Sequence, residues 1–163
     1  MTAKQALDSL VKADPHSEGR QVAMVDAKGN VAAYTGKGVH PRRRPADRRQ
    51  LLVQANLMSN ATIWPAMATA FEKARGDPRR AHDASARGGA AAGGDIRGKQ
   101  SAAIVVVKAQ STGKPWADRV MDLRVEDHPE PLKELRRLMR LRRAYNLEDA
   151  GDNFISEKKP RRR

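Results

Sequence analysis

Hydrophobic positions along the first third of the chain change from helical to strand spacing. Apolar residues recur every three or four positions after Thr2, which predicts a helix capped by Thr2 and ended by Asp14-Pro15. Two short apolar runs then cover residues 21–25 and 31–35, and the turn between them contains Gly29, which is suited to a positive φ. The pattern therefore predicts a helix followed by an antiparallel hairpin.

The rest of the chain alternates further strands and helices. Residues 51–56 are predicted as a strand, and a helix with Pro65 in its first turn follows. We then expect a buried strand over 101–108, a half-buried strand over 119–125 and a long helix over 131–145. Two segments without periodicity are predicted loops, namely residues 36–50 and 79–94.

The order of these elements predicts the fold class. Helix, hairpin, strand, helix, strands and helix in succession favour an α+β fold with antiparallel strands. A chain of 163 residues buries enough surface for one domain, which we place at residues 1–149. Residues 150–163 form a polar, basic tail that is predicted to be disordered.

Composition narrows the class of protein. The absence of cysteine excludes disulfides, thiolate metal sites and a cysteine nucleophile. Neither a signal peptide nor an apolar run near the roughly 20 residues of a membrane helix is present, so we expect a cytoplasmic protein without membrane contact. The four histidines are scattered and no pair has metal-ligand spacing, so no metal and no cofactor are expected.

The net charge of +13 suggests a polyanion partner, but its distribution weakens that interpretation. Residues 41–50 and 158–163 together supply +9 of the +13. One hypothesis is weak, non-specific nucleic-acid or polyanion binding through the Arg42–Arg49 loop and the Lys158–Arg163 tail. The alternative is that both runs are solvated segments, and the aromatic content of 4% argues against base stacking.

The most site-like segment is the glycine-rich stretch at residues 93–101. Its backbone amides could hold an anion, and four of its side chains could bind a polar substrate: Asp95, Arg97, Gln100 and Ser101. A strand follows in place of a helix, so this is not a Walker A loop. The alternative is a structural loop that leads into a core strand.

Weaker candidates lie elsewhere. Asn56 could reach a site from its strand, although such an amide more often satisfies backbone groups. Asp122 could contribute a carboxylate or pair with Arg124 on the same strand face. Asp127 and His128 could form an acid/base pair, although the stretch DHPEP is more typical of a helix start.

Several strings in one order resemble the DUF1028 family, which is assigned to the N-terminal-nucleophile (Ntn) hydrolase-like fold. These strings are ALDSLVKADP, RQVAMVDAKGNVAAYTG, VQANLMSNATIWPAMATAFE, AGGDIRGKQSAAIVVV and DRVMDLRVEDHPEPLKELRRLMRLRRAYN. The resemblance implies a partial αββα sandwich of antiparallel sheets. It also implies hydrolysis of an amide-type bond in an unknown small substrate, with an N-terminal amine as the base.

The resemblance also sets expectations about what this chain lacks. Members of the family begin with further strands that carry the nucleophile, so we expect an N-terminally truncated domain that is inactive alone. Thr2 is rejected as the nucleophile because it precedes a helix and not a strand. The catalytic residues are therefore unknown, and sheet edges left without partner strands predict a homo-oligomer.

Residues 42–52 and 78–90 fit neither the family nor an ordinary folded segment. Both windows are rich in Arg. With permitted codons, reading the first window one base later gives a family-like turn, and reading the second one base later gives a composition typical of a helix. We hypothesise that both windows are translated out of frame. The alternative is a pair of divergent, disordered loops.

Overall fold

The computed structural model of the chain describes residues 1–39, 46–48, 51–74 and 78–158. Helices and strands both occur throughout, so the predicted α+β class is confirmed. In chain order the elements are α1 (Ala3–Ala13), a 3-10 turn (Ser17–Gly19), β1 (Gln21–Val25), β2 (Val31–Thr35), β3 (Ala46–Arg48), β4 (Leu51–Val53), α2 (Ile63–Lys73), α3 (Pro78–Ala91), β5 (Ala102–Val107), α4 (Pro115–Asp118), β6 (Arg119–Val125) and α5 (Pro131–Lys158).

Within the described ranges, the strands form antiparallel pairs. β1 pairs with β2, β3 with β4, and β5 with β6. Three pairs of facing residues fix the registers: Gln21 opposite Thr35, Ala46 opposite Val53, and Ala102 opposite Val125. The predicted antiparallel arrangement is therefore present in each pair.

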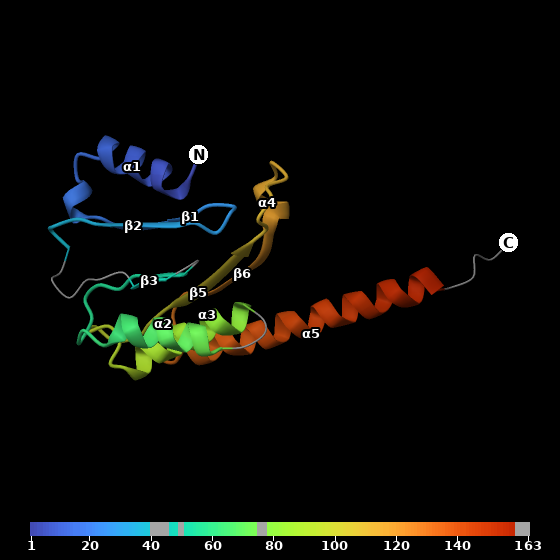
Figure 1. The fold of residues 1–163 in the computed structure, drawn as a ribbon. Coiled ribbons are helices and arrows are strands. Elements are labelled where there is room, and N and C mark those ends of the chain that lie inside the picture. Colours follow the sequence, from blue (N-terminus) through green and yellow to red (C-terminus); the bar gives the residue numbers. More distant parts are fainter. Residues whose placement is uncertain (40–45, 49–50, 75–77, 159–163) are drawn as a thin grey trace.

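The elements stack in layers, as Figure 1 shows. Helix α1 lies on one side of the β1–β2 hairpin, and the remaining strands lie on the other side of that hairpin. Helices α2, α3 and the first half of α5 pack beneath those strands. The far half of α5 projects away from the body of the molecule.

Hydrogen bonds fix the start of α1 and join this helix to the turn of the β1–β2 hairpin. The Thr2 Oγ1 accepts from the Gln5 backbone N–H at 3.2 Å, and the Gln5 Oε1 accepts from the Thr2 N–H at 2.9 Å. This reciprocal pair is a capping box, which satisfies donors that a helix start leaves open. The Asp26 carboxylate then accepts from Asn30 in the hairpin turn and from the Ala3 N–H, which links the turn to α1.

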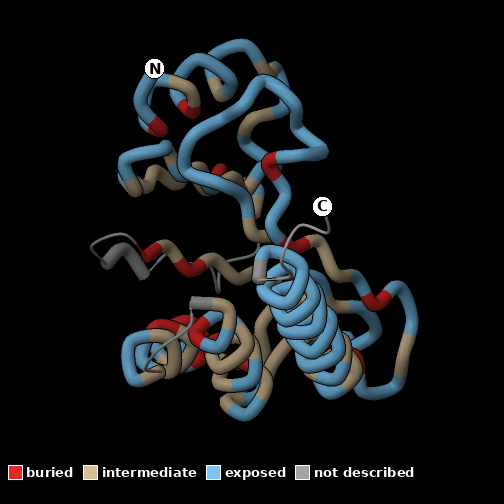
Figure 2. Tube along the Cα trace, turned by 90° about the vertical axis from the view of Figure 1, so that its right-hand side faces the viewer, coloured by how far each residue is buried: buried red, intermediate tan, exposed pale blue. Residues whose placement is uncertain are grey.

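The apolar core is divided into two clusters of buried side chains. One contains Leu51, Val53, Trp64 and Ala68, from β4 and α2. The other contains Ile104, Met121, Val125 and Leu135, from β5, β6 and α5. In Figure 2 the buried positions are few and separated, whereas the long α5 helix is exposed along most of its length.

The prediction of a loop over residues 79–94 was wrong, because Pro78–Ala91 form helix α3. Two glycines and a single type of apolar residue make this a weak helix sequence on local grounds. Packing against α2 outweighs that weakness. A Cβ on Gly88 would lie 2.8 Å from the Ala70 Cβ, and one on Gly89 would lie 2.6 Å from the Met67 Cγ. The glycines therefore let the two helices approach closely.

This helix also changes the interpretation of the Arg-rich windows. Residues 78–90 fold as a packed helix, which removes the structural reason to suspect an altered reading frame there. Most of the other window, 42–52, lies outside the described residues, although β3 occupies part of the predicted loop. Pairing with β4 accounts for that strand, since residues 36–50 have no periodicity of their own. The reading frame itself stays a prediction.

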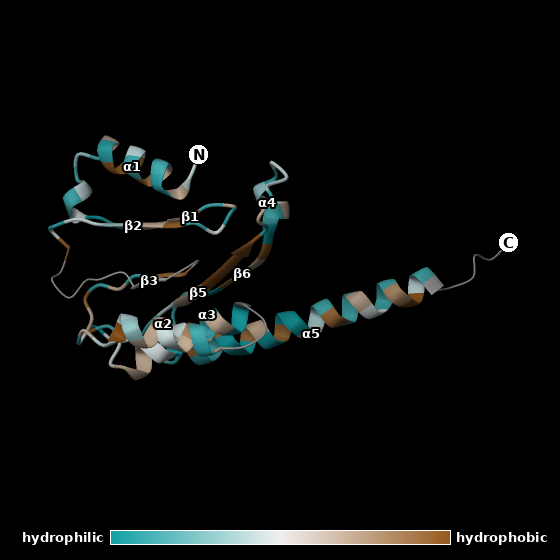
Figure 3. Cartoon of the chain, viewed as in Figure 1, coloured by the Kyte–Doolittle hydropathy of each residue, from teal (hydrophilic) through white to brown (hydrophobic). Residues whose placement is uncertain are grey.

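Two further predictions require correction. Strand β5 is not buried on both faces, because Val105 and Val107 are 51% and 60% exposed. In the described part of the chain, the sheet of β5 has two strands and α5 covers only one of its faces. The other face stays exposed although β5 is strongly hydrophobic, as Figure 3 shows. Helix α5 extends to Lys158, so residues 150–158 are helical where disorder was predicted.

Of the described helices, none is long and apolar enough to span a bilayer.

Replacement of the two α3 glycines by alanine separates close packing from helix propensity. Gly88→Ala places a Cβ against Ala70 and 3.1 Å from the Ala66 carbonyl oxygen, neither of which can turn aside. We expect a net loss of about 1–2 kcal/mol in unfolding free energy, because overpacking exceeds the propensity gain of about 1 kcal/mol. Gly89→Ala meets the flexible Met67 side chain, so we expect a change below about 1 kcal/mol. Urea denaturation of both variants measures this difference, and equal losses would contradict it.

Candidate functional site

The loop over residues 93–101 is fixed at both ends by backbone hydrogen bonds. The Ser59 N–H donates to the Gly94 carbonyl at 3.0 Å, and the Ile96 N–H donates to the Leu57 carbonyl at 2.9 Å. At the far end, the His128 N–H donates to the Gln100 carbonyl at 2.9 Å. The loop is therefore held between the segment before α2 and the segment before α5.

Glycine is required where this loop leaves α3. Gly93 has a φ of 127°, in the region that side chains disfavour, and a Cβ there would collide with the Ser59 Oγ. The Asn60 Nδ2 also donates to the Ala92 carbonyl at 2.8 Å. The close passage of the two segments places Asp95 beside Met58, where the chains form a single antiparallel bridge.

Asp95 and Arg97 form a two-pronged ion pair. The Asp95 Oδ1 accepts from the Arg97 Nε at 2.9 Å, and its Oδ2 accepts from the Arg97 Nη2 at 2.6 Å. The Oδ1 also accepts from the Arg97 backbone N–H at 2.8 Å. These hydrogen bonds, the side-chain ones foremost, lower the pKa of Asp95 to about 2. Asp95 is therefore a carboxylate near neutral pH and cannot act as a proton donor.

A cavity of about 560 Å³ lies beside this loop, between α3 and the start of α5. All four side chains predicted from the loop line it: Asp95, Arg97, Gln100 and Ser101. Lys99 and Gln54 line it as well, and Met58, Met67 and Leu132 add apolar surface. The structure thus brings together four of the six predicted site residues, while their role stays a prediction.

The other two predicted residues lie away from this cavity. The Asn56 Nδ2 donates to the Gln21 Oε1 at 3.1 Å, so that amide joins the segment after β4 to β1. Asp122 accepts from Arg124 at 2.9 Å and from Arg119 at 3.1 Å, which confirms the predicted strand-face ion pair with Arg124. Neither side chain is among the lining residues. Asn56 and Asp122 therefore do not join the loop residues.

The segment before α5 behaves as a helix start. The His128 Nδ1 accepts from the Glu130 N–H at 2.9 Å, and the Glu130 carbonyl accepts from the Glu134 N–H at 3.1 Å. Pro131 follows in the first turn, where its missing N–H costs nothing. The geometry favours the helix-start interpretation over an acid/base pair.

A second cavity of about 460 Å³ adjoins the first and shares Gln54 and Ser101 with it. His82 and Ser85 line it, and sequence analysis missed both because their segment was predicted as a loop. The His82 ring meets the Phe71 ring edge-on at 5.0 Å between centroids. Partial burial of the imidazole lowers the pKa of His82. The helical spacing of His82, Ser85 and Gly89, which places all three on one helix face, was the signal in the sequence that could have identified these residues.

The chemistry that this region offers is recognition of a polar molecule. Two cations, one carboxylate, a hydroxyl and two amides surround the loop cavity. Its described lining includes neither a histidine nor a second hydroxyl, so it holds no serine–histidine pair. Across the described ranges, no group of three His, Cys, Asp or Glu side chains has the arrangement of a metal site.

The Arg42–Arg49 loop and the Lys158–Arg163 tail were the predicted polyanion-binding segments. The side chains of both runs lie outside the described residues. Polyanion binding through them therefore stays a prediction.

The fold and the loop cavity define an α+β protein built from small antiparallel sheets, with a pocket that carries a few polar groups beside its helices. The chain belongs to a family described as "Family of unknown function (DUF1028)", whose model matches residues 1–135. The predicted family resemblance is thereby confirmed. No match was found among curated proteins.

A solved structure has the same fold. It is the crystal structure of a protein from Silicibacter pomeroyi that carries the same family model, and it superposes with a TM-score of 0.73 at 23% sequence identity. The match covers 86% of this chain and 59% of that protein, so the chain spans about three fifths of its relative's length.

The Asp95–Arg97 pair predicts a pH-dependent contribution to stability. The pKa of Asp95 falls from 3.8 to about 2 on folding, so the pair stabilises the fold fully above pH 4. That contribution is lost as the pH falls from about 4 toward 2. We expect Asp95→Asn to unfold at lower urea than the parent at pH 7 and to match it more closely at the lowest pH at which both fold. A difference that does not depend on pH would contradict this expectation.

Proposed function

We propose that the chain provides the substrate-positioning part of an Ntn-hydrolase-like domain that cleaves an amide-type bond in a small polar molecule. One observation carries the proposal: Arg97, Lys99, Gln100 and Ser101 converge on one cavity of about 560 Å³. That volume lies in the range of small-molecule sites, roughly 300–1,000 Å³. The apolar lining with a few polar groups is also typical of such sites.

The layer order supports the fold part of this proposal. A helix, a hairpin sheet, further strands and a helical layer follow one another through the molecule in Figure 1. An αββα sandwich has the same order of layers. The assignment of hydrolysis rests on fold analogy, and a fold by itself supports many activities.

The proposed substrate carries a carboxylate near its amide bond. Asp95 occupies the Nε and one Nη2 hydrogen of Arg97, and a guanidinium has further donors that can meet an anion. Lys99 adds a second positive charge to the lining. Gln100 and Ser101 are exposed and can hydrogen-bond to the amide itself. The proposal gives these residues positioning roles and assigns none of them as the attacking group.

Binding of N-acetylated amino acids tests the role of Arg97. Calorimetry with a panel of these compounds and their uncharged amides should show a preference for the free carboxylate. Arg97→Gln should weaken binding of the carboxylate compounds by about tenfold, because a charge-assisted hydrogen bond is lost. Binding of the uncharged amides should change little.

Arg137→Gln is the matched control for this experiment. Arg137 also pairs with a neighbouring carboxylate, Glu134 at 2.7 Å, but lies on α5 away from the cavity. Equal effects of the two substitutions, or no binding by any panel member, would rule out Arg97 as the recognition group. Release of free amino acid from a bound compound tests cleavage separately, so binding without release would reject hydrolysis and retain recognition.

A further inference from the structure

A separate cleft lies on the other side of α3, where it faces α5 and the end of α2. Its volume is about 580 Å³, and it shares no lining residue with the cavity beside the loop. Alanine and methionine side chains form the apolar part of its lining, among them Ala70, Met121 and Met139. The polar part consists almost entirely of cations.

The cations come from both helices at helical spacing. Arg80 and Arg87 are seven residues apart on α3, so they lie on one face of that helix. Arg136, Arg140 and Arg143 lie at successive turns of α5 and also share a face. Two rows of guanidinium groups therefore border the cleft.

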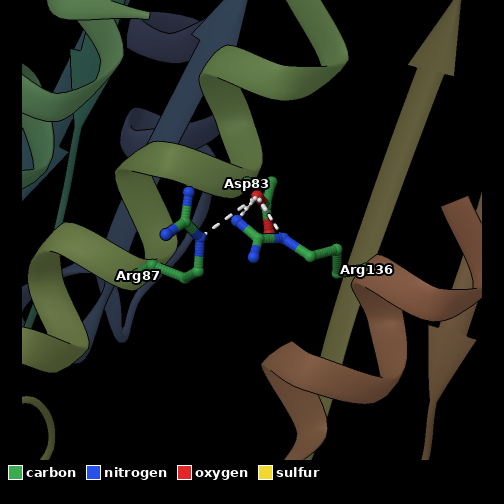
Figure 4. A network of polar contacts seen from close by, with 3 residues as sticks. All are labelled: Asp83, Arg87 and Arg136. Carbon is green, nitrogen blue, oxygen red and sulfur yellow. Dashed lines mark hydrogen bonds and ion pairs between the residues drawn. The ribbon is translucent and has the colours of Figure 1, made fainter. Parts of the chain in front are cut away.

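One carboxylate links the two rows. Asp83 is only 10% exposed, and its Oδ2 accepts from the Arg87 Nε at 3.1 Å. The same oxygen accepts from the Arg136 Nε at 3.2 Å and from its Nη2 at 3.1 Å. Figure 4 shows the two guanidinium groups meeting at this carboxylate from opposite helices. Asp83 thus fixes one arginine of each row.

Positive charge in the cleft far exceeds what Asp83 can balance. Six arginines and Lys73 line it, and Asp83 is the one carboxylate among the described lining residues. Arg80, Arg140 and Arg143 form no ion pair with any carboxylate that the structure describes. Like charges held together repel, and a multivalent anion between them would relieve that repulsion.

We propose that this cleft binds a small, linear anion with three or more phosphoryl groups. Arginine forks match phosphate oxygens in pairs, and they are fixed here on two helices. Arg136 and Arg143 are seven residues apart, which corresponds to about 10 Å of helix at a rise of about 1.5 Å per residue. The row therefore suits an extended ligand better than a single phosphate. The described lining contains no aromatic ring on which a nucleic-acid base could stack.

Calorimetric titration of the full chain with inorganic tripolyphosphate tests this proposal. We expect binding at a 1:1 ratio that weakens between about 50 and 200 mM salt, as charge neutralisation requires. The double substitution R140Q/R143Q should lower the affinity by about tenfold or more, because two phosphate-facing forks are removed. Both side chains are exposed, so far-UV circular dichroism should remain unchanged.

The matched control is R137Q/R142Q, which removes the same charge from the same helix. Arg137 and Arg142 are exposed and lie outside the cleft lining. The tripolyphosphate affinity of this variant should therefore stay within about twofold of that of the parent, measured at the same salt concentration.

Three results would overturn the proposal. Equal losses of tripolyphosphate affinity in the two double variants would show that the anion is attracted by net charge and does not bind in the cleft. Equally tight binding of orthophosphate would remove the requirement for a chain of phosphoryl groups. Tighter binding of a single-stranded oligonucleotide at the same salt would assign the cleft to nucleic acid. None of these results depends on the loop cavity, because the two sets of lining residues are separate.

Discussion

The close contact between α2 and α3 is the constraint on which both candidate sites depend. Gly88 and Gly89 let the helices approach until there is no room for a Cβ, although these glycines weaken α3 as an isolated helix. Helix α3 then presents Ala86 and Gly89 to the cavity beside the loop. It presents Arg80, Asp83 and Arg87 to the basic cleft. A displacement of α3 would therefore change the two sites together.

The two sites differ in how their charges are held. In the loop, Asp95 and Arg97 are two residues apart, so a short segment fixes its own ion pair among the residues that line the cavity. In the cleft, Asp83 and Arg136 are distant in the sequence, and their bond forms only when α3 and α5 pack. The ion pair of the cleft is thus a product of the tertiary fold, whereas the ion pair of the loop is local.

This distinction also explains what could be predicted from the sequence. The helix capped by Thr2, the hairpin turn with Gly29 and the loop residues 95–101 were predicted because nearby residues determine them. Helix α3 was missed because its stability comes from α2, and His82 and Ser85 were missed with it. Gln54 and Asn56 follow β4, and their hydrogen bonds to β1 and β2 result from packing that no local pattern reveals.

The two halves of α5 differ in what stabilises them. The first turns are anchored by Leu135, which is 5% exposed, whereas nearly every described residue from Arg140 onward is exposed. A helix without tertiary support is marginal in water, because each turn then depends on local propensity alone. Gly151 lowers that propensity further. Amide hydrogens near Leu135 consequently exchange with solvent only when the β5–β6–α5 cluster opens, while those of the projecting half exchange by local fraying of the helix.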